Sequence, residues 1–403
     1  MDLFLARQPI FDRQQSVIAY ELLFRSSSGG PVPDSEYEQA ALNVIRDIFF
    51  VFGLEHLTTG KKAFINVSRR ALIEEKVTIF PPDQTVIEIV ETIEPDPEVI
   101  TACTNLKHAG YKLALDDFTY REELEPLIAL ADYIKIDFKQ TLGEERKALL
   151  EKFKGTEIEL IAEKVETHSE FNEAYAYGYP YFQGYFICEP ELIAGKDIPG
   201  FKINYLRFLR EVNQPSLDLD KLEQIIKQDV SLSYKLLRYL NSAWFGWRTE
   251  VTSIKGALVR LGEQPTKKWA SLVAYTNLAE DKPSELLLTS LIRARFCELA
   301  GPEAGLKGKD LDLFLMGMFS LIDALVDRPL VEVLDEVSVS DEVKNALLGK
   351  PSQINRIYQL VLAYERGEWD RVLSMANELS MDRSRILECY TQAVEWAGQI
   401  FRM

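Results

Sequence analysis

The chain has 403 residues, with 46 Lys plus Arg against 63 Asp plus Glu, so its formal net charge is −17. This length allows two domains with sizeable cores, and the acidic balance argues against a nucleic-acid polymer or an anionic membrane surface as partner. No apolar run is long enough to span a membrane, residues 1–7 do not resemble a signal peptide, and the four cysteines form no CxxC pair. We therefore expect a cytoplasmic protein with reduced thiols and no membrane insertion.

The first two predicted elements are strands, at residues 4–10 and 17–24. The connection between them, residues 11–15, is too short for a crossover helix, so the two strands should be antiparallel. Further along, short apolar runs alternate with predicted helices at residues 38–52, 97–109 and 122–131.

Each apolar run in the first half ends in a polar or charged residue. The runs are Val17–Glu21, Phe64–Asn66, Val86–Glu88, Leu113–Asp117, Tyr133–Asp137, Leu160–Glu163 and Tyr181–Gln183. A carboxylate just past a buried strand is costly unless it is paired or binds a metal. Recurrence at spacings of roughly 20 to 30 residues predicts a (β/α) barrel whose strand ends converge on one site.

The pattern changes near residue 200. Strand signals fade, and leucines recur at helical spacing, as at Leu232, Leu236 and Leu240. We predict an α/β domain at residues 1–200 and an all-helical domain at residues 201–403, with the boundary in residues 194–200.

The strand-end residues have the chemistry of a metal site. Mg²⁺ and Mn²⁺ prefer oxygen ligands, and the adjacent carboxylates Asp116 and Asp117 suit a bridge between two ions. The remaining ligands would be Glu21, Asn66, Glu88 and Glu163. Lys135 would orient or deprotonate a water, or balance charge, during attack of metal-activated water on a phosphodiester. The alternative is that each acid is a solvated strand end or half of an ion pair.

The segment Tyr20-Glu21-Leu22-Leu23-Phe24-Arg25 resembles the signature of EAL domains, which hydrolyse cyclic di-GMP to linear pGpG. The resemblance continues in order through Phe64–Ser68, Glu88–Glu91, Asp116–Phe118, Lys135–Asp137, Ala162–Thr167 and Phe182–Tyr185. It implies a (β/α) barrel that binds two Mg²⁺ or Mn²⁺ ions and cyclic di-GMP, and that pairs with a second copy.

By this resemblance each site residue takes a family role. The implied metal ligands are Glu21, Asn66, Glu88, Asp116 and Asp117. Glu21, Lys135 and Glu163 are the implied catalytic residues, Arg25 contacts a phosphate, and Gln183 is a site glutamine.

The sequence departs from the family at Leu22, where alanine is usual, and at two places that concern activity. Active members carry a glycine-rich loop after the paired aspartates, whereas Thr119-Tyr120-Arg121 contains no glycine, and Lys164 stands where a glycine is usual. Supporting residues orient metal ligands, so two hypotheses stay open. The barrel is either an active phosphodiesterase or a catalytically inactive receptor for cyclic di-GMP or scaffold.

The second half has its own resemblance. Residues 228–243 are similar to the opening of HDOD domains, and residues 251–262 and 314–320 extend the similarity. HDOD domains are helical relatives of metal-dependent HD phosphohydrolases, whose metal sites need histidine. All three histidines, His56, His108 and His168, lie in the first half. The helical half therefore carries no HD-type metal site. We expect it to regulate the barrel or bind a protein partner whose identity the sequence does not give, with a purely structural domain as the alternative.

Overall fold

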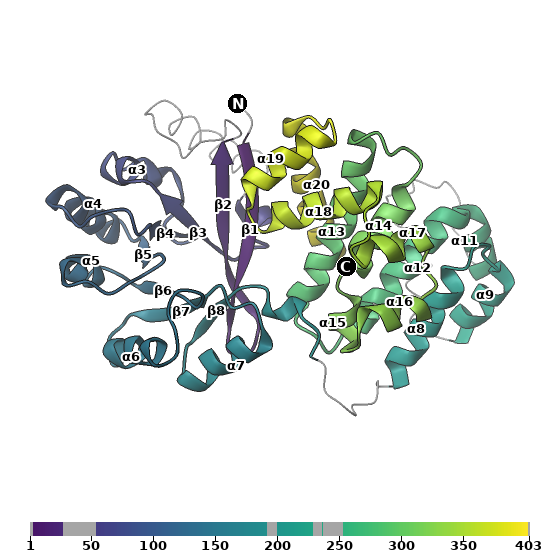
Figure 1. Cartoon of the computed structure of the whole chain (residues 1–403), viewed down its shortest axis with the longest axis horizontal. Helices are drawn as coiled ribbons and strands as arrows, with labels where there is room; N and C mark the ends of the chain where they lie inside the picture. Colours follow the sequence, from purple (N-terminus) through teal and green to yellow (C-terminus); the bar gives the residue numbers. More distant parts are fainter. Residues whose placement is uncertain (1–2, 27–53, 192–199, 229–235, 237–252, 402–403) are drawn as a thin grey trace. The chain divides into compact units, whose positions relative to one another are not determined.

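The computed structural model describes residues 3–26, 54–191, 200–228, 236 and 253–401 (Figure 1). By contact the chain forms two compact units, of which the first contains residues 1–189 and 360–403 and the second residues 190–359. This grouping differs from a single division at residue 200, because the last 44 residues join the barrel unit. The predicted helix at residues 38–52, all but the last residue of the predicted boundary segment and most of the 228–243 motif lie outside the described residues.

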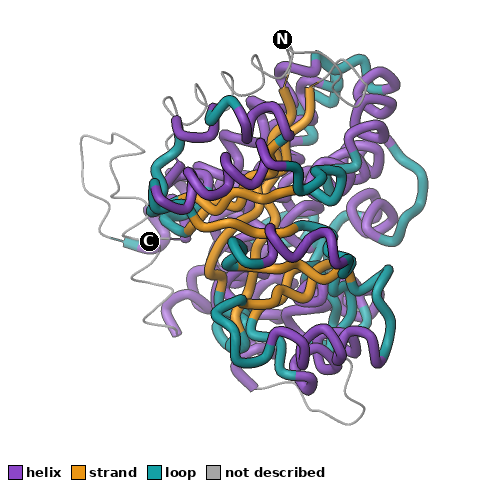
Figure 2. The backbone as a smooth tube through the Cα atoms, turned by 90° about the vertical axis from the view of Figure 1, so that its left-hand side faces the viewer, coloured by secondary structure: helices purple, strands orange, loops and turns teal. Residues whose placement is uncertain are grey.

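The first unit is built on a closed barrel whose strands follow one another in chain order. These strands are the orange segments in Figure 2. The strands are β1 (Leu3–Asp12), β2 (Val17–Ser26), β3 (Lys62–Val67), β4 (Thr85–Ile89), β5 (Lys112–Leu115), β6 (Tyr133–Asp137), β7 (Glu159–Glu163) and β8 (Tyr181–Gln183). Strand β1 is antiparallel to β2 and to β8, and the other neighbours are parallel. The predicted barrel and its antiparallel first pair are confirmed.

Short helices follow the strands from β2 to β8. They are α2 (Leu54–Leu57), α3 (Arg69–Ile73), η1 (Lys76–Ile79), α4 (Pro97–His108), η2 (Glu122–Leu124), α5 (Glu125–Ile128), α6 (Glu144–Phe153), α7 (His168–Tyr177) and η3 (Phe186–Cys188). Local sequence explains where α4 and α7 begin. Asp96 accepts hydrogen bonds from the amides of Glu98 and Val99, and Thr167 and Glu170 form a capping box.

The barrel interior has an apolar layer and, above it, a polar layer. The apolar layer is one buried cluster made by Ile10, Ala19, Phe64, Val86, Ala114, Tyr133 and Ile161. Side chains two residues apart on a strand point to the same face, so the residue two positions further toward the carboxyl end also points inward. This places Glu21 above Ala19, Glu88 above Val86 and Lys135 above Tyr133.

The last three helices, α18 (Gln353–Glu365), α19 (Trp369–Glu378) and α20 (Arg383–Phe401), bring residues 360–403 against β1 within the first unit. The Tyr364 hydroxyl accepts from the amide of Leu5 at 3.3 Å, and the Tyr390 hydroxyl accepts from the amide of Arg7 at 3.2 Å. Because β8 pairs only with Ile10 to Asp12 of β1, these hydroxyls satisfy amides that the barrel leaves without a strand partner.

The second unit is helical. Its helices are α8 (Gly200–Val212), α9 (Leu219–Gln228), α11 (Ile254–Leu261), α12 (Glu263–Leu278), α13 (Ser284–Glu303), α14 (Asp310–Phe319), α15 (Ile322–Val326), α16 (Leu330–Glu336), α17 (Asp341–Leu347) and the first part of α18. Helices α13 and α14 pack closely, since a Cβ atom on Gly317 would come within 2.4 Å of the carbonyl oxygen of Arg293. In the described part of the chain, no helix has the length and hydrophobicity needed to cross a membrane.

Candidate active site

Acidic side chains from neighbouring strands surround the ammonium group of Lys135 at the carboxyl end of the barrel. Lys135 Nζ lies 2.8 Å from Glu21 Oε2 and 2.9 Å from Glu88 Oε1. It lies 2.9 Å from Asp116 Oδ1 and 3.7 Å from Glu163 Oε1. Lys135 and Glu88 are completely buried. Four carboxylates therefore share one ammonium group out of contact with bulk water.

Glu21 has the most complete set of hydrogen-bond donors in this cluster. Asn66 Nδ2 donates to its Oε1 at 2.8 Å, and Gln183 Nε2 donates to its Oε2 at 2.5 Å. Gln183 Nε2 also donates to Gln8 Oε1 at 3.0 Å, which links β8 to β1 across the site. These contacts fix the orientation of the Glu21 carboxylate before any ligand binds.

The four carboxylates differ in pKa because burial and Lys135 affect each of them differently. Burial opposes ionisation of Glu21, but the charge of Lys135 and the hydrogen bonds to Glu21 outweigh it and hold the pKa of Glu21 below its usual value. Burial raises the pKa of Glu88 well above its usual value and also raises that of Asp116. Burial raises the pKa of Glu163 to about 8. One ammonium does not compensate four buried acids, so the cluster favours uptake of another cation or of protons.

The chemistry of the remaining donors fits an oxygen-liganded divalent ion. Buried oxygen atoms that accept no hydrogen bond are Asn66 Oδ1, Glu88 Oε2, Glu163 Oε2 and Gln183 Oε1. Glu88 Oε1 and Asp116 Oδ1 have the ammonium of Lys135 as their ion-pair partner. Hard divalent cations take oxygen ligands of these types. Across the described ranges, no three or more His, Cys, Asp or Glu side chains are already arranged to hold a metal. The ammonium of Lys135 lies among the carboxylates of Glu21, Glu88 and Asp116 instead.

Asp117 is held apart from this cluster by a second lysine. Lys164 Nζ donates to Asp117 Oδ1 and to Asp137 Oδ2, each at 2.7 Å. The other oxygen of Asp137, Oδ1, accepts from the amides of Lys139 at 2.6 Å and Gln140 at 3.1 Å. Burial opposes ionisation of Asp137, but these hydrogen bonds hold its pKa below its usual value. Asp117 and Asp137 are thus both bound to the ammonium of Lys164, whose side chain is 37% exposed.

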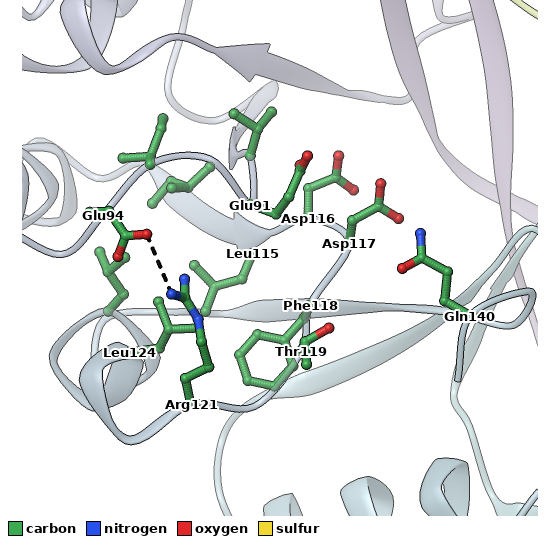
Figure 3. Close-up of a pocket in the computed structure, with 14 residues that line it drawn as sticks. Glu91, Glu94, Leu115, Asp116, Asp117, Phe118, Thr119, Arg121, Leu124 and Gln140 are labelled. Atoms are coloured by element: carbon green, nitrogen blue, oxygen red, sulfur yellow. Dashed lines mark hydrogen bonds and ion pairs between the residues drawn. The ribbon is translucent and has the colours of Figure 1, made fainter. Parts of the chain in front are cut away.

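A cavity of about 390 Å³ opens beside the acidic cluster (Figure 3). Asp116, Asp117 and Phe118 line it, and Arg121 Nη1 lies 3.4 Å from Glu94 Oε1 at its edge. This volume lies within the range of small-molecule sites, roughly 300–1,000 Å³. The segment after Asp117, which departs from the glycine-rich family pattern, therefore forms part of the wall of a ligand-sized space.

The structure brings most of the predicted site residues together. Glu21, Asn66, Glu88, Asp116, Lys135, Glu163 and Gln183 form one connected cluster. Asp117 lies beside Asp116 but is bonded to Lys164, and its predicted metal-bridging role stays a prediction. The side chain of Arg25 lies outside the described part of the chain. The sequence assigned no role to Gln8 or Asp137, although Asp137 is the polar residue that ends the predicted strand Tyr133–Asp137.

Residues 2–190 match the EAL domain family and residues 198–326 match the HDOD domain family. The uncharacterized protein YuxH of Bacillus subtilis is 36% identical over 408 residues, and the alignment covers 99% of each chain. The cyclic di-GMP phosphodiesterase CdgJ of Vibrio cholerae is 31% identical over 404 residues, covering 99% of this chain and 93% of CdgJ. Among solved structures, a standalone EAL protein from Vibrio cholerae O395 in its c-di-GMP-bound form is 23% identical, covers 46% of this chain and 90% of that chain, and gives a TM-score of 0.37.

Proposed function

Because the chain belongs to the family of proteins that join an EAL domain to an HDOD domain, we propose that its barrel hydrolyses cyclic di-GMP to linear pGpG. The carboxylate cluster around Lys135 is the observation that carries this proposal. A buried excess of acids with unbonded oxygens, beside a ligand-sized cavity, suits a metal-dependent reaction on an anionic substrate. CdgJ, which aligns with nearly the whole chain, is a cyclic di-GMP phosphodiesterase by name.

In this proposal the divalent ion, Mg²⁺ or Mn²⁺, lowers the pKa of water and offsets phosphate charge when it is bound. Glu21, Asn66, Glu88 and Asp116 would hold it, whereas Asp117, the predicted bridge to a second ion, is bonded to Lys164. Gln183 keeps Glu21 oriented through its hydrogen bond. Lys135, which is protonated in this cluster, would orient the attacking water or balance charge. Glu163 would accept the proton of that water, and Arg25 would contact a phosphate.

The test is a turnover assay of the full chain with cyclic di-GMP and Mn²⁺, in which chromatography resolves pGpG from the substrate. Glu21→Gln should abolish pGpG formation, because a metal ligand that acts in the transition state contributes several kcal/mol. Glu98→Gln is the matched control, since Glu98 forms an exposed pair with Arg69 outside the barrel mouth. Wild-type turnover by Glu21→Gln would remove this cluster from the chemistry.

A second candidate function is a catalytically inactive receptor for cyclic di-GMP. The ion pairs of Lys164 with Asp117 and Asp137 favour it, because the ammonium of Lys164 already binds Asp117, a predicted metal ligand. Binding of cyclic di-GMP without formation of pGpG, with Mn²⁺ present, would support the receptor and exclude the enzyme.

We further propose that the protein acts in the cytoplasm, that two copies pair through the barrel, and that the HDOD domain regulates the barrel or binds another protein. The four cysteines, all within the described residues, form no disulfide with one another, which agrees with a reducing compartment. Mass measurement of the full chain with and without cyclic di-GMP tests pairing, and a single-copy mass under both conditions would exclude it.

A further inference from the structure

Lys164 is an unusual residue at the barrel mouth in both its conformation and its contacts. Its φ of 57° lies in the left-handed region, which is sterically unfavourable for a residue with a side chain. Asp117, one of its two partners, also has a left-handed φ, of 45°. Strained backbone at a site persists only where the surrounding contacts favour it.

The contacts of Lys164 compensate this strain. Its ammonium lies 2.7 Å from one oxygen of Asp117 and 2.7 Å from one oxygen of Asp137. Asp137 follows Lys135 by two residues on β6, so it lies on the inward face of the barrel, nearer the mouth. Asp137 is only 4% exposed, and its carboxylate therefore needs a cation or donors within the protein.

The ion pairs of Lys164 lie next to the Lys135 cluster. Asp117 adjoins Asp116, which contacts Lys135, and Lys164 adjoins Glu163, which lies at the edge of the same cluster. The mouth therefore holds two neighbouring groups of carboxylates. The Lys135 cluster has more carboxylates than its one ammonium can compensate, and it contains oxygens without a hydrogen-bond partner. Asp117 and Asp137 already share the ammonium of Lys164.

We propose that the Lys164 ammonium is a built-in substitute for one divalent ion, so that Asp117 and Asp137 bind no metal while Lys164 is present. The site of the wild-type chain then takes one divalent ion fewer than the same site without this lysine. The proposal deepens the function proposed above, and rests on it for the divalent-metal site at the barrel mouth. Direct competition is its physical basis, because a metal at Asp117 would have to displace an ammonium that holds two carboxylates at hydrogen-bond distance.

The experiment counts Mn²⁺ ions bound to the full-length protein. The protein is stripped with a chelator and dialysed, Mn²⁺ is added, and bound ions are counted by equilibrium dialysis with elemental analysis. Lys164→Met removes the charge and keeps the side-chain length, and Lys164→Gly also relieves the left-handed backbone. Lys164→Arg retains a cation. Lys139→Met is the matched control, since it removes only a side chain that pairs with Glu166 on the surface and leaves the Lys139 amide, which donates to Asp137 Oδ1, in place. Circular dichroism and thermal unfolding establish that each variant is folded.

We expect Lys164→Met and Lys164→Gly each to bind one Mn²⁺ ion more than the wild type, and Lys164→Arg and Lys139→Met to bind the wild-type number. The proposal is overturned if Lys164→Met and Lys164→Gly both fold and neither binds more Mn²⁺ than the wild type. It is also overturned if Lys139→Met gains the same number of ions. Failure of the proposed function is separate and visible in the wild type. A wild type that binds no Mn²⁺ and forms no pGpG removes the phosphodiesterase, whereas a gain of one ion in Lys164→Met would still support the role of Lys164.

Discussion

At the scale of single residues, the buried ammonium of Lys135 compensates the negative charge of the acidic cluster before any metal binds. Its ammonium contacts Glu21, Glu88 and Asp116 at 2.8–2.9 Å, and its pKa is raised well above the usual value because these charges outweigh the effect of burial. Removing one partner of a buried charge pair leaves the other uncompensated.

Lys135→Met should therefore lower the free energy of unfolding by about 3–5 kcal/mol at pH 7 in a chelator. The deficit should shrink as pH falls, because protonation neutralises the acids that lost their partner. Urea unfolding measures both effects. Lys139→Met, which removes a surface charge, should cost no more than about 0.5 kcal/mol. Equal costs for the two variants would show that Lys135 does not hold the acids in the folded state.

A second residue-scale prediction concerns pH and the helical unit. Burial raises the pKa of Asp323, in α15, from 3.8 to about 6. The unfolded chain then releases this proton at lower pH than the folded chain, so the free energy of unfolding falls as pH rises from about 4 to about 6. The loss is at most about 3 kcal/mol at 1.36 kcal/mol per pH unit, and partial exposure of Asp323 reduces it.

Asp323→Asn removes this titration and retains an oxygen for the Ala324 amide, which donates to Oδ1 at 2.9 Å in the wild type. The melting temperature of the variant minus that of the wild type should rise between pH 4 and pH 7 and then level off. A difference that does not change with pH would contradict the proposed burial of this carboxylate.

At the scale of elements, the second unit depends on the close approach of α13 and α14. Gly317 Cα lies so near the α13 backbone that an added Cβ atom would meet Arg293 O at 2.4 Å and Arg293 C at 2.5 Å. Backbone atoms cannot rotate away as a flexible side chain can, so the helices must separate.

Gly317→Ala should destabilise the protein by about 1–3 kcal/mol despite the better helix propensity of alanine. Gly398 in α20 is the matched control, because an added Cβ atom there has no neighbour within 4 Å. Gly398→Ala should stabilise the protein by roughly 0.4–1 kcal/mol. Thermal unfolding compares the two variants. If both substitutions change the stability in the same direction, the close approach of α13 and α14 does not restrict the side chain at residue 317.

The strands could be predicted from the sequence because each is short, buried and ended by a polar residue. The run from Tyr133 to Asp137 coincides with β6, and the run from Leu160 to Glu163 lies within β7. The helix predicted at residues 122–131 is instead the short pair η2 and α5. The ion pair between Asp117 and Lys164 joins residues 47 positions apart, so no local pattern indicates it. Local periodicity gives the inward face of a strand, but not which inward groups bind each other.

At the scale of the whole molecule, the chain leaves the barrel unit near residue 190 and returns to it at residue 360. Residues 327–403 lie beyond both family matches, and their last helices nevertheless complete the barrel unit. Phe4 of β1 stacks on Trp369 with ring centroids 5.5 Å apart, and it meets Tyr364 edge-on. Sequence periodicity identified these segments as helical but did not indicate that they cover β1.

This cover should stabilise the barrel unit through two hydroxyl groups. In the full chain, Tyr364→Phe with Tyr390→Phe keeps both rings but removes the acceptors for the amides of Leu5 and Arg7. Leaving a buried donor without its partner costs about 1–3 kcal/mol, so the barrel unit should lose several degrees of thermal stability.

Hydrogen exchange should increase at β1 first. Tyr275→Phe, which removes a hydroxyl hydrogen bond to Ser290 within the helical unit, should leave exchange at β1 unchanged. Because β1 also carries Gln8, whose side chain accepts from Gln183 in the site, the double variant should weaken Mn²⁺ binding as well. Unchanged exchange at β1 in the double variant would mean that residues 360–403 pack on the barrel unit without holding its first strand.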